Sequence, residues 1–101
     1  MTCFLRRRSG REELPDRAVH EVFEHFGYTW IVHGVPLKRG RFSRKLFGVV
    51  EATTGRQLCE FLRDPESVAD AKSQAIRYLD GKGRERTAKA IADCLAEEAR
   101  Q

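Results

Sequence analysis

A run of basic side chains offers the clearest chemistry in this sequence. Five of the eight residues from position 38 to position 45 are cationic and none is acidic; the five are Lys38, Arg39, Arg41, Arg44 and Lys45. Like charges crowded together repel one another unless an anionic partner offsets them, and phosphate backbones are the commonest such partner. The run therefore predicts a surface that binds a polyanion, although a charge run is also typical of an ordinary solvated face.

Two further features favour nucleic acid as the polyanion. Phe42 lies inside the basic run, where an exposed aromatic ring can stack on a base or wedge against a sugar. A second cationic segment near the N-terminus comprises Arg6, Arg7, Arg8 and Arg11. We expect residues 1–13 to form a flexible basic arm that follows a backbone or enters a minor groove, so that the arm and the basic run make a two-part clamp.

No catalytic pattern accompanies these cations. The conventional general bases are His20, His25 and His33, and on a helix His20 and His25 would lie about 140° apart, so they cannot form a zinc-binding pair of the HExxH type. A mixed zinc site of His33 with Cys59 stays open, but zinc usually takes four ligands and no spacing supplies the others. We expect no enzymatic activity, no metal and no cofactor.

The cysteines predict a reducing environment. Cys3, Cys59 and Cys94 are odd in number and widely spaced, without a CxxC pair or an apolar signal segment, so we expect free thiols that act as small apolar residues. The Gly81-Lys82-Gly83 stretch lacks the phosphate-loop pattern and predicts a link between helices. No apolar run approaches the roughly 20 residues that a membrane span needs. These observations predict a cytoplasmic protein without membrane contact.

Length and composition predict one folded domain. The chain has 101 residues, of which 41% are hydrophobic and 34% charged, with a formal net charge of +4. Residues 1–60 contain 11 Lys and Arg against 7 Asp and Glu, whereas residues 61–101 contain 8 of each kind. The basic excess therefore belongs to the N-terminal part, and we expect residues 14–101 to form a single α+β domain.

The first half of this domain predicts a helix followed by a sheet. Asp16 can cap a helix of about ten residues whose apolar positions recur every three or four residues, with Gly27 placed to end it. β-Branched and aromatic residues predict strands over about 28–35, 46–53 and 56–62, with Gly55 in a tight turn between the last two. The basic run falls between the first two strands, at the end of a hairpin.

Trp30 lies on one face of the first predicted strand, and that face is either open to solvent or buried. Tyr28, Trp30 and Val32 share that face, and if it were open it would offer an aromatic platform for single-stranded nucleic acid. The sequence favours Trp30 as a buried anchor, because a lone tryptophan in a small domain contributes most when it is buried.

The second half predicts two helices. Asp64-Pro65-Glu66 has the pattern of a helix start, and an apolar stripe then continues to Leu79 before Asp80-Gly81 ends the helix. A last helix is expected over about 85–99, antiparallel to the first. The predicted fold is thus α+β, with a short three-stranded antiparallel sheet, helices packed on one face, and the order α-β-β-β-α-α.

This order is similar to that of double-stranded RNA-binding domains, in which the loop at residues 35–39 would be the minor-groove loop. The chain departs from that family at Asp64-Pro65-Glu66-Ser67, where the family has a basic helix start. The segment from Tyr28 to Leu79 also resembles the sheet-reading DNA-binding domains of some integrases and plant transcription factors. Both resemblances imply a nucleic-acid-binding role, and no specific motif identifies a family.

The sequence therefore predicts a non-enzymatic small basic domain that contacts nucleic acid or a nucleoprotein complex through a cationic hairpin loop and the N-terminal arm. The alternative is a protein-binding inhibitor from a phage or mobile element, for example an inhibitor of an RNA-guided defence complex, that docks on an acidic protein surface. A homodimer formed through an edge strand or the C-terminal helix is a further possibility.

Overall fold

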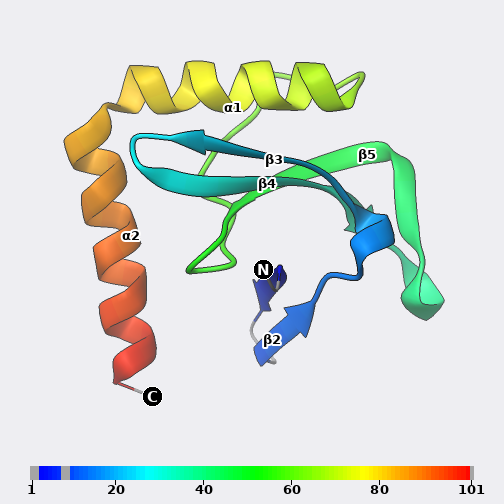
Figure 1. Cartoon of the computed structure of the whole chain (residues 1–101), viewed down its shortest axis with the longest axis horizontal. Helices are drawn as coiled ribbons and strands as arrows, with labels where there is room; N and C mark the ends of the chain where they lie inside the picture. The colour runs from blue at the N-terminus through cyan, green and yellow to red at the C-terminus, as the bar shows by residue number, and fades with distance from the viewer. Residues whose placement is uncertain (1–2, 8–9, 101) are drawn as a thin grey trace.

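The computed structural model describes residues 3–7 and 10–100. Strands β3, β4 and β5 form a three-stranded antiparallel sheet in that order, and β1 pairs antiparallel with β2 in a separate two-stranded sheet (Figure 1). The elements are β1 (Phe4–Arg7), β2 (Gly10–Glu13), the 3-10 turn η1 (Asp16–Ala18), β3 (Val19–His25), β4 (Tyr28–Pro36), the 3-10 turn η2 (Lys38–Gly40), β5 (Phe42–Glu51), α1 (Val68–Lys82) and α2 (Arg84–Ala99). The α+β class is confirmed, but the order is β-β-β-β-β-α-α, which also removes the likeness to the order of double-stranded RNA-binding domains.

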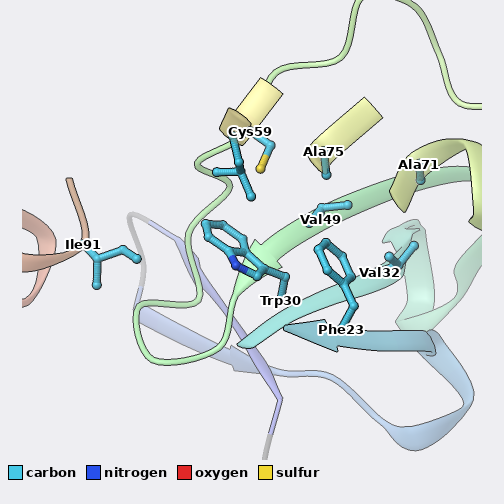
Figure 2. Close-up of a cluster of buried hydrophobic side chains, with 9 residues drawn as sticks. Phe23, Trp30, Val32, Val49, Cys59, Ala71, Ala75 and Ile91 are labelled. Atoms are coloured by element: carbon cyan, nitrogen blue, oxygen red, sulfur yellow. The ribbon is translucent and has the colours of Figure 1, made fainter. Parts of the chain in front are cut away.

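Buried side chains cover both faces of the three-stranded sheet. One face directs Phe23, Trp30, Val32 and Val49 toward α1, as Figure 2 shows. On the opposite face, Ile31 and Val50 are buried with four residues from the N-terminal segment, namely Cys3, Leu5, Leu14 and Ala18. Neighbouring residues of a strand point to opposite faces, so β4 and β5 contribute to both cores.

Trp30 is a core anchor, as the sequence favoured. Its side chain is fully buried, and its indole Nε1 donates a hydrogen bond to the carbonyl oxygen of His25 at 3.2 Å. Because α1 covers this face, an open aromatic platform around Trp30 is excluded. Burial of the ring and satisfaction of its one polar atom are what a tryptophan in a small core requires.

The predicted helix at residues 16–26 is wrong, because this segment forms η1 and the edge strand β3. Phe26 and Gly27 both have positive φ angles, 57° and 81°, and they make a two-residue turn that pairs His25 with Tyr28. Such turns match the twist of a hairpin. Gly27 thus serves a hairpin and does not end a helix, and Val22, one of the apolar residues of the predicted helix, is 46% exposed.

The predicted third strand at residues 56–62 is also wrong. Gly55 does adopt a positive φ of 65°, but its carbonyl oxygen accepts a hydrogen bond from the N–H of Arg6 in β1 at 2.8 Å. A Cβ atom at position 55 would lie 2.5 Å from the Phe4 ring. The N-terminal hairpin therefore packs against this turn, and the chain beyond it leaves the sheet to bury Cys59 beside α1 (Figure 2).

Both predicted helices exist, with a different start and a different arrangement. Ser67, and not Asp64, caps α1, because its Oγ accepts the N–H of Asp70 at 3.0 Å. Only Gly83, with a φ of 94°, separates α1 from α2, and α2 turns away from the axis of α1 (Figure 1). The predicted antiparallel pair is wrong because a reversal needs a link of about 2–5 residues. Neither helix of the described chain is long and apolar enough to cross a membrane.

Candidate nucleic-acid interface

The basic run lies at the end of the β4–β5 hairpin, as predicted. Pro36 pairs with Phe42 at the base of the loop, and the N–H of Leu37 donates to the carbonyl oxygen of Arg41 at 2.8 Å. Arg39 and Gly40 at the tip have φ angles of 60° and 71°. This end of the hairpin bends away from α1, toward the side of the sheet on which the N-terminal strands lie (Figure 1). The loop thus projects from the body of the domain.

The five cations of the basic run are all exposed, and none forms an ion pair with a carboxylate of the described residues; they are Lys38, Arg39, Arg41, Arg44 and Lys45. Other cations behave differently: Arg63 pairs with Asp70 at 2.6 Å, and Lys89 pairs with Asp93 at 3.0 Å. The positive charge of the hairpin is therefore not offset within the described chain, so it is available to an external anion.

Arg17 joins the basic run in space. Its Nη2 donates a hydrogen bond to the carbonyl oxygen of Gly40 at 3.1 Å, and its guanidinium carbon lies 5.8 Å from the centroid of the Phe42 ring. Arg17 falls in the segment predicted to be a helix after Asp16, so it was not among the predicted site residues. No local pattern reveals it, because η1 and β3 bring it to the loop only through the pairing of β3 with β4.

An open groove of about 910 Å³ follows the hairpin end. Its lining includes the cations Arg17, Arg39, Arg41, Arg44 and Lys45. The Oγ of Ser43 accepts the N–H groups of Lys45 and Leu46 at 3.1 and 2.8 Å, which holds the backbone that carries Arg44 and Lys45. Phe42 lines the groove as well, but its ring is half-buried and packs against the core on the β1–β2 side of the sheet. The groove is therefore lined by cations together with the exposed side chain of Leu37.

The N-terminal cations have contacts of their own. Arg7 pairs with Glu12 at 2.7 Å, Arg6 pairs with Glu98 at 3.5 Å, and Arg11 stacks on the Phe4 ring with 3.8 Å between its guanidinium carbon and the centroid. Arg8 lies outside the described residues.

Within the predicted arm, the described residues form β1 and β2, and Phe4 and Leu5 are buried. Apolar residues at the start of the chain thus attach it to the sheet, which basic composition alone did not predict.

Burial shapes the chemistry of one histidine and one cysteine. His33 is buried with Nδ1 2.9 Å from the carbonyl oxygen of Gly34, and burial lowers the pKa of its imidazole. Cys59 lies in the core on the α1 side, where burial raises the pKa of its thiol to about 12, so the thiolate is scarce at neutral pH. Among the described residues no three His, Cys, Asp or Glu side chains are grouped to hold a metal ion.

The chain matches no known protein family, and comparison with curated proteins and with solved structures likewise gives no match.

Proposed function

We propose that the protein binds nucleic acid, or the nucleic-acid part of a nucleoprotein complex, through the end of the β4–β5 hairpin, and that it catalyses no reaction. The observation that carries the proposal is the set of five exposed hairpin cations without a carboxylate partner in the described chain, with Arg17 held beside them. Phosphate groups offset such a charge, and guanidinium groups bind phosphate oxygens through paired hydrogen bonds.

The positions of the aromatic side chains favour contacts with the phosphate backbone of the nucleic acid over stacking on its bases. Trp30 is fully buried, and Phe42 is half-buried beneath Arg17. Contacts to phosphate position a protein on nucleic acid without reading its sequence. We therefore expect weak sequence preference, strong salt dependence, and a secondary contribution from Arg6, Arg7, Arg8 and Arg11.

The test compares wild type with the variant R39A/R41A/R44A for binding to labelled duplex DNA, duplex RNA and single strands at low salt. The matched control R77A/R86A/R100A removes the same charge from exposed positions on α1, on α2 and directly after α2. The hairpin variant should lose most of its affinity, whereas the control should retain it. Both should keep the free energy of unfolding of wild type within about 0.5 kcal/mol, because the substituted side chains are exposed.

Absence of binding by wild type to every nucleic acid at low salt would overturn the proposal. The same arginines would then be tested against an acidic protein surface, as the inhibitor hypothesis requires. If the hairpin variant lost free energy of unfolding as well as affinity, the loop would instead have a structural role.

A further inference from the structure

A second surface, separate from the hairpin, has the features of a binding site. A groove of about 490 Å³ lies where α1, the start of α2 and the chain before α1 meet, and we call it the α1 groove. Leu62 and Tyr78 supply apolar lining, Arg77, Lys82 and Arg86 supply cations, and Glu60 supplies the one acid. Its size is within the range of sites that bind small ligands or short segments.

Leu62 is the most unusual side chain of the α1 groove. It is 86% exposed, more than any other large hydrophobic residue of the described chain. Leu62 also lines a smaller neighbouring hollow of about 120 Å³, as does Arg77, so these residues border two hollows. An exposed apolar side chain that lines two hollows offers a partner a surface that is removed from water on binding.

Leu62 is exposed on a fixed backbone. The N–H of Leu62 donates to Oε1 of Gln74 at 3.0 Å, and Arg63 binds both carboxylate oxygens of Asp70 at 2.6 and 3.1 Å. Both partners lie on α1. The segment is thus ordered before a ligand arrives, which lowers the entropic cost of binding.

Charge indicates the chemistry of the ligand. Arg77, Lys82 and Arg86 form no ion pair with a described carboxylate, although Lys82 Nζ lies 5.9 Å from the centroid of the Tyr78 ring. With Glu60 as the opposing acid, the lining keeps a positive excess. A ligand that suits the groove therefore combines an apolar group with negative charge.

We propose that the α1 groove binds an acidic peptide segment of a partner protein. One apolar side chain of the segment packs against Leu62 and Tyr78, and flanking carboxylates face Arg77, Lys82 and Arg86. An extended chain can occupy both hollows that Leu62 lines, whereas a compact ligand fills one of them. This site is independent of nucleic-acid binding by the hairpin.

The test uses a short fluorescein-labelled peptide that has leucine and phenylalanine at its centre between runs of glutamate. Two control peptides replace the glutamates by lysine or the central pair by alanine. Anisotropy is measured on the full chain carrying R39A/R41A/R44A, so that the hairpin cannot capture the peptide. In that background L62S and R77E/R86E should each weaken binding about tenfold or more. The control L95S, at a residue 42% exposed on α2, should leave the affinity unchanged.

The proposal is overturned if the acidic peptide does not bind the hairpin-substituted chain, if the lysine peptide binds equally well, or if L62S has no effect. It is supported if binding survives the hairpin substitutions and is lost with L62S. Because the proposed nucleic-acid binding depends on the hairpin cations, which this assay removes, failure here leaves the proposed function to its own test.

Discussion

Replacing Arg39, Arg41 and Arg44 by alanine should change the salt dependence of nucleic-acid binding by an amount that follows from the hairpin's charge. Each phosphate that a protein neutralises on duplex DNA contributes about −0.9 to the slope of log K against log salt. If each cation of the basic run meets one phosphate, the wild-type slope is about −4.5. The triple variant keeps two of the five cations, so its slope should be about −1.8.

These slopes predict a large and measurable difference. Between about 50 and 200 mM salt, affinity should fall about 500-fold for wild type and about 12-fold for the variant. Fluorescence anisotropy with a short labelled duplex over a salt series measures both slopes. Thermal unfolding followed by the fluorescence of Trp30, a fully buried residue, checks that the fold is unchanged.

The control R77A/R86A/R100A separates local contacts from net charge, since it carries the same total charge as the hairpin variant. It should keep the slope of wild type. Equal slopes in wild type and the hairpin variant would refute the reasoning, because the substituted arginines would then not neutralise phosphates. Equal flattening in both variants would show that net charge, and not the hairpin, governs binding.

Three further predictions concern the residues that shape the sheet and the hairpin. Arg39 has a φ of 60°, which costs a non-glycine residue about 1 kcal/mol, so R39G should not lower the free energy of unfolding in urea denaturation. The same variant should weaken nucleic-acid binding, because it removes one hairpin cation. The fully buried carboxylate of Glu51 accepts hydrogen bonds from the N–H groups of Thr53 and Thr54 at 2.7 and 3.0 Å. E51Q should therefore lower the free energy of unfolding by about 1–3 kcal/mol, and an unchanged midpoint of urea denaturation would contradict this. Burial lowers the pKa of His33, so the unfolded chain takes up a proton before the folded chain does as pH falls below about 6.5. Urea denaturation should therefore show the free energy of unfolding falling by up to about 1.4 kcal/mol per pH unit in this range, and H33Q should remove this fall.

Local patterns in the sequence correctly predicted the strands and helices whose conformation follows from their own residues. The β-branched and aromatic run before Pro36 predicted β4, and the stripe that includes Ala71, Ala75 and Leu79 predicted α1. The second strand was found with shifted ends, since β5 begins at Phe42 and not near Leu46. In each case the buried side chains recur at the period of the helix or strand, or fill the strand continuously, so the local pattern suffices to predict the element.

The errors occurred where a distant segment decided the conformation. Residues 19–25 carry apolar spacing compatible with a helix, but pairing with β4 and the turn at Phe26 and Gly27 make them a strand. Phe26 is not a usual residue for a positive φ, so the turn gave no signal. Similarly, β1 packs on the turn at Gly55, and no third strand follows this turn.

For the candidate site, the sequence by itself determined the five cations and their place at the end of a hairpin, although Arg44 and Lys45 lie within β5 and not between the strands. The tertiary structure decided that they project from the domain, that none pairs with a described carboxylate, that Arg17 joins them and that Phe42 is half-buried. The physical reason is that charge is local to a side chain, whereas exposure and ion pairing depend on which segments of the folded chain lie beside it.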